Sequence, residues 1–369
     1  MSSERLATSL LSRLEVANIR CIERVNVDLA PSINVLIGAN GQGKTSLLEA
    51  IYLVATTRSF RTHRMRDVIR HGATACSVRA ILSNDFVERE QIVGFSLTSR
   101  KVQIDGRRPE SSALYALRTP VVVFHPGELE LTMGAAVRRR TFLDRVALFI
   151  DAQSHYAHQA YEQAMKNRQK LLQSDGPSAK GIDVYEQLMA QHGVFVARCR
   201  KQAVDEITIA AQEAFAQVSP ASSQLIMRYI PGGCFNENET IIRLRQRRNL
   251  DAHRQSASFG PHRDDLDIEL NGVSARTCAS QGQHRLLTLS LKIAEMVCVG
   301  RGSGVRPLLL LDDVSSELDA ERTEDFFRLL GQRRDQVFIT TTRRDMLDVF
   351  EKSIGQAKVF AVESGSVTN

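Results

Sequence analysis

The residues best suited to chemistry in this chain form a glycine-rich stretch that ends in lysine and threonine. The stretch matches Gly-x-x-x-x-Gly-Lys-[Ser/Thr] at every specified position, between an apolar run at residues 33–37 and a helical run at residues 46–55. Glycines let backbone N–H groups close around phosphate oxygens, and the start of a helix adds about half a positive charge there. We therefore predict a nucleotide-binding loop made of Gly38, Ala39, Asn40, Gly41, Gln42, Gly43, Lys44 and Thr45. In such a loop Lys44 reaches the β and γ phosphates, and Thr45 holds Mg²⁺.

A pair of carboxylates, Asp312 and Asp313, follows the four leucines at residues 308–311. Such a run predicts a buried strand, and α/β sheets bind their ligands at the carboxyl ends of strands. Asp312 is at the position where a phosphate-loop ATPase holds Mg²⁺ through a second carboxylate, and Asp313 is placed to orient an attacking water. We predict Lys44, Asp312 and Asp313 as catalytic residues and Thr45 with Asp312 as the metal site. The alternative, core leucines followed by a turn, is disfavoured by the phosphate loop on the same chain.

A second candidate anion site is the stretch Ser280-Gln281-Gly282-Gln283, which precedes a helical pattern at residues 286–299. A serine and a glycine immediately before a helix leave free N–H groups that point outward. An ordinary helix N-cap, for which Ser280 suffices, is the alternative interpretation. Elsewhere, the strand predicted at residues 336–342 should place hydroxyls beside the terminal phosphate, from Thr340, Thr341 and Thr342.

Cations are dense in the segment that follows the first helix, where Arg58, Arg61, Arg64 and Arg66 lie close together. Arginine beside serine and threonine is the composition that contacts DNA backbone phosphates without reading sequence. We favour this interpretation of the four arginines over that of a solvated loop. Two further basic clusters, Arg138 to Arg140 and the group Arg243, Arg245, Arg247 and Arg248, are explained equally well by the outer face of a helix or strand.

Length and composition limit the remaining choices. The chain has 369 residues, which is enough for one large core or two lobes of ~100–200 residues. Its net charge of +6 is compatible with a polyanionic partner. No run approaches the ~18 apolar residues of a membrane span, and the first residues lack the apolar core of a signal peptide. We therefore expect a cytoplasmic protein without a membrane partner. The six cysteines have no Cys-x-x-Cys spacing, so neither a zinc site nor a disulfide framework is indicated.

The elements that must position these residues are those of an α/β chain. Alternating apolar and polar residues predict an antiparallel strand pair at residues 14–19 and 25–29. More strands are predicted between residues 76 and 104, with Asp105-Gly106 closing a hairpin, and at residues 120–124. Residues 138–172 and 184–218 are helix-compatible, and the breaker cluster at residues 174–178 separates them, which predicts two antiparallel helices. Residues 224–270 return to short strands.

These patterns predict an α/β fold in which a mixed sheet carries an added antiparallel β-layer and a mainly helical second lobe. We place the first part of the nucleotide-binding lobe at residues 1–125 and its second part, with the carboxylate pair, at residues 301–369. The helical hairpin and the second anion site belong to the lobe at residues 126–300.

Several of these motifs resemble those of ABC-type ATPases. Ser280 to Gln283, with Arg285, is similar to the signature Leu-Ser-Gly-Gly-Gln, and residues 312–319 resemble a Walker B aspartate, a catalytic acid and a D-loop in one run. Their order and spacing are similar to those of SMC- and Rad50-type ATPase heads. Residues 56–62, 259–266, 280–283 and 312–319 together resemble the RecF family of bacterial recombination mediators, over nearly the whole chain.

This resemblance implies a function. RecF-like proteins bind ATP and dimerise with two nucleotides between the Walker A loop of one subunit and the signature of the other. They bind DNA in the ATP state, and slow hydrolysis releases the dimer. Acting with RecR and RecO at single-strand gaps next to duplex, they help RecA replace single-strand binding protein in repair, replication restart and SOS induction. The residues agree with a dimer, because a two-fold interface pairs two separate anion sites twice.

The chain also departs from the ABC pattern. Ala279 and Gln281 replace the signature Leu and first Gly, which leaves Ser280 and Gly282 as the γ-phosphate contacts. Asp313 replaces the usual catalytic Glu, Thr341 or Thr342 lies where a switch His is usual, and His125 lies near the Q-loop position. These departures indicate weak hydrolysis. An SMC-like structural DNA ATPase is the alternative, but the two anion motifs are only 236 positions apart (280 − 44), and the stretch between them cannot supply a long coiled coil. A transporter ATPase has no use for the basic segment.

Overall fold

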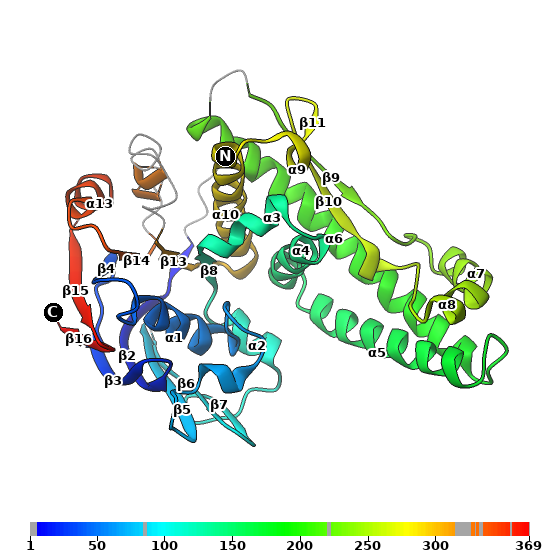
Figure 1. The fold of residues 1–369 in the computed structure, drawn as a ribbon, viewed down its shortest axis with the longest axis horizontal. Coiled ribbons are helices and arrows are strands. Elements are labelled where there is room, and N and C mark those ends of the chain that lie inside the picture. Colours follow the sequence, from blue (N-terminus) through cyan, green and yellow to red (C-terminus); the bar gives the residue numbers. More distant parts are fainter. Residues whose placement is uncertain are drawn as a thin grey trace. The chain divides into compact units, whose positions relative to one another are not determined.

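The computed structural model describes residues 6–83, 87–219, 223–313, 326–328, 330–331, 335–354 and 356–368. The chain forms two compact units, which can be followed by colour in Figure 1. Unit 1 comprises Met1–Glu128 and Glu295–Asn369, and unit 2 comprises Leu129–Ala294. As functional domains, the lobes predicted with boundaries at residues 126 and 300 stay a prediction.

Unit 1 contains a six-stranded sheet in the order β16-β15-β4-β14-β13-β8. Its neighbours pair in parallel except for β15 and β16. The strands are β4 (Ile33–Ile37), β8 (Val121–Phe124), β13 (Leu308–Asp312), β14 (Val337–Thr341), β15 (Ala357–Glu363) and β16 (Ser366–Thr368). Every residue of β4, β13 and β14 is buried, as their continuous apolar runs predict for parallel strands covered on both faces. The pairing sets Asp312 opposite Thr340 and Thr340 opposite Leu36, so three functional segments end at one edge of the sheet.

A second, antiparallel sheet in unit 1 has five strands in the order β3-β2-β5-β6-β7. They are β2 (Leu10–Ile19), β3 (Ile22–Asp28), β5 (Ala75–Ser83), β6 (Glu88–Ser96) and β7 (Arg100–Ile104). The β2–β3 pair confirms the predicted antiparallel opening of the chain. One hydrophobic core joins both sheets through helix α1 (Lys44–Thr56), since Leu14 and Val78 cluster with Leu48 and Phe338.

Unit 1 also contains smaller elements among the described residues. They are β1 (Ala7–Thr8), which pairs with β12 (Val305–Arg306), η1 (Met65–Val68), α2 (Ser112–Leu117), η2 (Pro126–Leu129) and α13 (Met346–Ile354). Asp105 and Gly106 both have positive φ, 49° and 74°, and lie between the bridged residues Ile104 and Arg107. The predicted hairpin is thus present only as a tight turn closed by one bridge, because the element that follows Arg107 is helix α2 and not a strand.

Unit 2 is mainly helical, with a three-stranded antiparallel sheet in the order β11-β10-β9. Its helices are α3 (Glu130–Met133), α4 (Ala136–Ile150), α5 (Gln153–Ser174), α6 (Ile182–Val218), α7 (Glu237–Gln246), α8 (Arg248–Arg254), η3 (Pro261–Arg263) and α9 (Ala275–Cys278). Its strands are β9 (Leu225–Ile230), β10 (Asp265–Leu270) and β11 (Val273–Ser274). Helix α10 (Gln281–Ser303) begins in unit 2 and ends in unit 1. Figure 1 shows α5 and α6 side by side as a hairpin, as predicted.

Two of the sequence predictions for unit 2 were wrong. The single helix predicted at residues 138–172 is divided into α4 and α5 at Asp151, which has extended φ and ψ of −144° and 111°. Its carboxylate accepts a hydrogen bond from the Gln153 N–H at 2.8 Å, so Asp151 helps to begin the second helix. Residues 224–270 were predicted to form short strands throughout, but between strands β9 and β10 the chain forms helices α7 and α8. Asn236 caps α7 by accepting from the Glu239 N–H at 3.0 Å.

Within the residues that the structure describes, no helix is both long enough and apolar enough to cross a membrane.

Candidate functional site

The glycine-rich loop connects β4 to α1 at the carboxyl edge of the six-stranded sheet. Gly38 passes so close to β15 that an added Cβ would lie 2.2 Å from the Val362 carbonyl oxygen. Gly43, the residue before α1, has φ +114°, a backbone conformation that residues other than glycine rarely adopt. Ala39, Asn40 and Gly41 are exposed to solvent at the loop's outer face. The outer face of the loop is thus open to solvent.

Lys44 lies beneath this loop with a buried side chain. Its Nζ donates hydrogen bonds to the carbonyl oxygens of Gly38 at 2.7 Å and Ala39 at 2.8 Å. Burial lowers the pKa of Lys44, and the negative charges of Asp313 and Asp312 partly oppose that shift. The lysine is therefore near both carboxylates, and its ammonium group faces the inner side of the phosphate loop.

Asp312 receives hydrogen bonds from two neighbouring segments. The Thr45 hydroxyl, on the first turn of α1, donates to its Oδ1 at 2.8 Å, and the Thr340 hydroxyl on β14 donates to the same oxygen at 2.8 Å. The Thr340 oxygen also accepts from the Asp313 N–H at 2.9 Å, where the Asp313 backbone has φ +52°. Thr45, Asp312 and Asp313 are brought together as predicted, and Thr340 fixes both carboxylate residues.

Oxygen atoms of a hydroxyl and a carboxylate are the ligands that Mg²⁺ takes from a protein. The Thr45–Asp312 pair supplies both within 2.8 Å. Among the described residues no group of three or more His, Cys, Asp or Glu side chains could hold a metal by itself. The chemistry of this pair suits an ion that is also held by phosphate oxygens and water.

Gln42, whose contact with the cofactor stays a prediction, also anchors the loop to a neighbouring turn. Its Oε1 accepts from the Ser364 N–H at 2.6 Å, and its carbonyl oxygen accepts from the Gly365 N–H at 2.9 Å. Both bonds lead to the turn between β15 and β16. The Gln42 side-chain oxygen and carbonyl oxygen thus anchor the loop to this turn.

The second predicted anion site begins helix α10 in unit 2. The Ser280 hydroxyl accepts from the Gln283 N–H at 3.3 Å, and the Gln283 side-chain oxygen accepts from the Ser280 N–H at 2.8 Å. This reciprocal pair is a capping box. Ser280 is exposed and Gly282 is partly exposed. Within one chain, Ser280 and Gln283 act as an N-cap, and their contact with a nucleotide stays a prediction.

The four arginines of the basic segment, residues 58–66, are all exposed. Arg58, Arg64 and Arg66 form no ion pair with any carboxylate among the described residues, but the Nη1 of Arg61 lies 3.2 Å from the Oε2 of Glu49. The Phe60 ring packs on Tyr52 of α1 and on His125, with ring centroids 5.5 and 5.2 Å away. The predicted D-loop, after Asp313, lies outside the described residues.

The other basic clusters are used inside unit 2. Arg139 forms a bidentate pair with Asp265 at 2.6 and 3.0 Å, and Arg140 donates to the Asp264 carbonyl oxygen. In the second cluster, Arg243 pairs with Glu239, Arg245 and Arg248 pair with Asp183, and Arg247 lies over the Phe259 ring. Of the explanations left open for these clusters, a structural role fits all members except Arg138.

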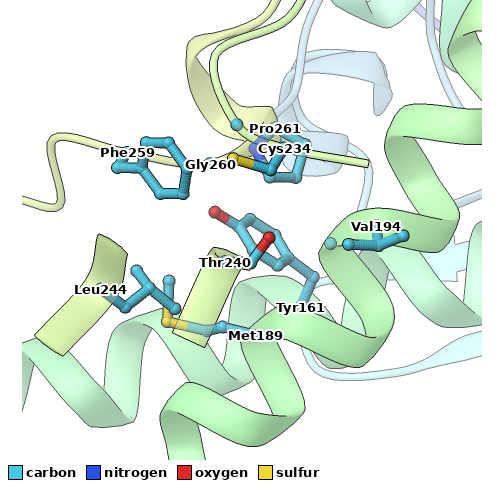
Figure 2. Close-up of a pocket in the computed structure, with 11 residues that line it drawn as sticks. Tyr161, Met189, Val194, Cys234, Thr240, Leu244, Phe259, Gly260 and Pro261 are labelled. Atoms are coloured by element: carbon cyan, nitrogen blue, oxygen red, sulfur yellow. The ribbon is translucent and has the colours of Figure 1, made fainter. Parts of the chain in front are cut away.

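The stretch at residues 259–265 also serves the fold of unit 2. The buried Asp264 carboxylate accepts from Arg200, from the Tyr229 hydroxyl and from the Gly232 N–H. Figure 2 shows the pocket beside this stretch, into which the Tyr161 hydroxyl projects near Gly260 and Phe259. No charged side chain lines this pocket, so it lacks the phosphate-binding chemistry found at the loop in unit 1.

Sequence reasoning missed Glu49 and Arg20. Glu49 is fully buried on α1, and Arg20 forms a bidentate pair with it at 2.8 and 2.9 Å. The available signal was a single carboxylate inside the otherwise apolar stretch Leu47-Leu48-Glu49-Ala50-Ile51. A charge in such a position is rarely tolerated without a partner.

Sequence comparison finds relatives along nearly the whole chain. The family model described as RecF/RecN/SMC N terminal domain matches residues 10–365. The DNA replication and repair protein RecF of Geobacter sp. (strain M21) is 34% identical over 366 residues, covering 97% of this chain and 99% of the relative. The protein of the same name from Myxococcus xanthus (strain DK1622) is 34% identical over 343 residues, 90% of each chain.

Solved structures give the same result for the fold. The recombination mediator protein RecF-ATP in the RecFOR pathway superposes with a TM-score of 0.89 at 26% identity, covering 100% of this chain and 99% of that one. The corresponding RecF-ATPrS structure has a TM-score of 0.87 at 26% identity, covering 98% of each chain. An Smc head domain from Pyrococcus furiosus shares the fold at a TM-score of 0.58 and 15% identity, covering 98% of this chain and 96% of that one. These neighbours confirm the predicted fold class, an ABC-type ATPase head with a second lobe.

Proposed function

The chain belongs to the RecF family, and from this premise we propose that it is an ATP-dependent DNA-binding recombination mediator. It acts at single-strand gaps and at junctions between single-stranded and duplex DNA, in repair, replication restart and SOS induction. Its relatives are named DNA replication and repair proteins, and the similar solved structures are RecF-ATP and RecF-ATPrS. In this proposal it works in the cytoplasm with RecR, and with RecO and RecA in the same pathway.

One observation carries the nucleotide part of the proposal. The phosphate loop, Lys44 and the Thr45–Asp312 pair converge at one edge of a parallel sheet, although Asp312 is 267 residues away from Thr45 in the sequence. A glycine-rich turn that carried Gly-Lys-Thr by chance would have no reason to meet a buried carboxylate there. Mg²⁺, when bound by Thr45 and Asp312, would neutralise charge on the β and γ phosphates of ATP.

The catalytic roles follow from the side chains around Lys44. The Lys44 ammonium, now bonded to the carbonyls of Gly38 and Ala39, exchanges them for phosphate oxygens. Asp313 orients the attacking water from a backbone fixed by Thr340. Because aspartate has a shorter side chain than the glutamate usual at this position, hydrolysis is slow and acts as a switch.

The second anion site acts between two copies of the chain. Ser280 and Gly282 of one subunit contact the γ-phosphate bound by the Walker A loop of the other, which makes dimerisation depend on ATP. The exposure of Ser280 supports this role, since a residue buried in its own subunit could not reach a partner. DNA is bound through the basic segment, whose four arginines are exposed.

Binding of ATP and of DNA tests the proposal directly. Lys44→Met should abolish binding of a fluorescent ATP analogue and with it dimerisation, measured by sedimentation. A matched control is Lys101→Met, an exposed lysine on β7 of the same unit, which should retain both. Filter binding to a gapped duplex should then show retention that depends on ATP for the wild type and the control only.

An ATP-dependent dimer that persists in Lys44→Met would contradict the nucleotide part of the proposal. If the wild type retained the gapped duplex equally with and without ATP, the proposed control of DNA binding by ATP would be contradicted. An SMC-like structural role is less well supported, because the longest described helix, α6, has 37 residues and extends only about 55 Å at 1.5 Å per residue.

A further inference from the structure

A buried carboxylate lies between the nucleotide loop and the basic segment. Glu49 is on α1, the helix that begins at Lys44, and its side chain has no exposed surface. A carboxylate in such a position must be fully hydrogen-bonded to remain ionised. The donors that satisfy it therefore determine which parts of unit 1 are tied to the nucleotide helix.

Two of these donors come from the basic segment. The Ser59 hydroxyl donates to Glu49 Oε1 at 2.5 Å, and the Arg61 Nη1 donates to Glu49 Oε2 at 3.2 Å. Ser59 in turn accepts from the backbone N–H groups of Arg61 at 3.0 Å and Thr62 at 3.1 Å. The first residues of the segment thus bond through their backbone to the Ser59 hydroxyl, which in turn bonds to Glu49 on α1.

The remaining donor is Arg20, in the turn between β2 and β3. Its Nε and Nη2 pair with both oxygens of Glu49, and its Nη1 donates to the carbonyl oxygen of Asp67, the residue that follows the segment. The Arg20 N–H also donates to the Val68 carbonyl at 2.9 Å. The Glu49–Arg20 pair therefore holds the basic segment at both ends.

The same turn touches the phosphate loop. The Sγ of Cys21 lies 3.8 Å from the Oγ of Ser46, on the first turn of α1. A Cβ added to Gly43 would lie 3.1 Å from that sulfur, so the turn and the loop backbone are in close contact. A shift of the loop on binding a nucleotide would meet Cys21 directly and Glu49 through α1.

We propose that Ser59 and Arg61 are positioning residues that couple the basic segment to the nucleotide loop through Glu49, and that Arg58, Arg64 and Arg66 are the segment's phosphate contacts. This rests on the proposed function and deepens it, because it separates one arginine of the predicted DNA site from the other three. Arg61 has only 40% of its side chain exposed and shares the buried Glu49 carboxylate with Arg20, whereas the other three have no carboxylate partner among the described residues. The Arg61 guanidinium is therefore directed towards α1.

Salt dependence distinguishes a positioning residue from a phosphate contact. Each phosphate contact adds about 0.9 to the slope of log K against log salt, and a residue that only positions others adds nothing. Ser59→Ala is the decisive variant, because it removes a bond to Glu49 without changing any charge. Arg61→Gln removes the second bond, and Arg64→Gln is the matched control for loss of a surface arginine.

The experiment measures fluorescence anisotropy on a gapped duplex over a salt series, with and without a non-hydrolysed ATP analogue. Ser59→Ala and Arg61→Gln should weaken binding in the presence of the analogue by roughly tenfold, the effect of one lost hydrogen bond to a charged group. Their salt slopes should equal that of the wild type, and the difference between the two nucleotide conditions should shrink. Arg64→Gln should lower the slope by about one contact and keep that difference.

Wild-type DNA binding by Ser59→Ala, or a slope in Arg61→Gln as low as in Arg64→Gln, would overturn the coupling. Thermal melting and binding of the ATP analogue serve as folding controls for each variant. A wild-type protein that bound neither the analogue nor the duplex would instead refute the proposed function. The two failures are therefore distinguishable.

Discussion

The Thr45 hydroxyl and the Asp312 carboxylate lie 2.8 Å apart, although 267 residues separate them in the sequence. Thr45 belongs to the helix after the phosphate loop and Asp312 to the end of a neighbouring buried strand. Thr340 completes the group by donating to the same Asp312 oxygen, also at 2.8 Å. Both threonine hydroxyls therefore bond to one oxygen of the Asp312 carboxylate.

Thr340→Val should raise the Mg²⁺ concentration needed for nucleotide binding by about 10-fold or more. Residues that hydrogen-bond to a metal-binding carboxylate commonly contribute that much to metal affinity. The valine keeps the shape but removes the donor to Asp312 and the acceptor for the Asp313 N–H. Titration of Mg²⁺ in a fluorescent-nucleotide assay measures the effect. Thr340→Ser keeps the hydroxyl and should behave as the wild type, and a serine variant as weak as the valine variant would show that packing is responsible.

Ser280→Arg should leave nucleotide binding intact and prevent ATP-dependent dimerisation, because the proposed contact of Ser280 is with the partner's nucleotide. Loss of the Ser280 cap costs about 1 kcal/mol of stability, too little to unfold the chain. Analytical ultracentrifugation with and without ATP gives the readout. Gln187→Arg, at an exposed position of α6, adds the same charge and should dimerise normally. A normal dimer in Ser280→Arg would exclude the shared-nucleotide arrangement.

Arg200→Met should destabilise unit 2 by about 3–5 kcal/mol, the cost of leaving a buried charge without its partner. Arg200 is 2% exposed and pairs with Asp144 and with the fully buried Asp264. Lys201→Met is the control, since Lys201 forms an exposed pair with Asp205 that contributes at most about 1 kcal/mol. Urea unfolding followed by circular dichroism compares the two, and similar midpoints would indicate that the buried pair is not needed for stability.

Stability should fall in mild acid because two histidines are held neutral in the fold. Burial lowers the pKa of His262, whose Nε2 donates to the Ala257 carbonyl at 2.9 Å, and burial also lowers the pKa of His284. An unfolded histidine takes up a proton as the pH falls below about 6.5, whereas these two resist it, so the unfolding free energy decreases.

The decrease is at most about 1.4 kcal/mol per pH unit for each histidine. It begins near the unfolded pKa and ends where the folded groups also become protonated. His262→Gln should flatten the curve between pH 7 and pH 5, measured as urea midpoints at each pH. The exposed His253→Gln is the control and should keep the wild-type curve. An equally steep curve in His262→Gln would assign the acid sensitivity to other groups.

Much of the local structure could be predicted because its causes are local. The strand pair β2–β3, the turn at Asp105-Gly106 and the helix after the loop follow from alternation, from residues that accept positive φ and from apolar periodicity. The break at Asp151 and the helix capped by Asn236 are also local, but a single side-chain acceptor decides each of them. Periodicity averages over a window and does not detect such an acceptor.

The sequence by itself determined the phosphate loop, because the path Gly38 to Thr45 depends on glycines and on the helix that follows them. Only the tertiary structure decided which charges are free. Arg139 pairs with Asp265, and Arg61 shares Glu49 with Arg20, while Arg64 remains exposed without a carboxylate partner among the described residues. Such pairs form between residues far apart in the chain. A carboxylate that is buried away from water needs a cation as its partner, and the fold decides which cation lies close to it.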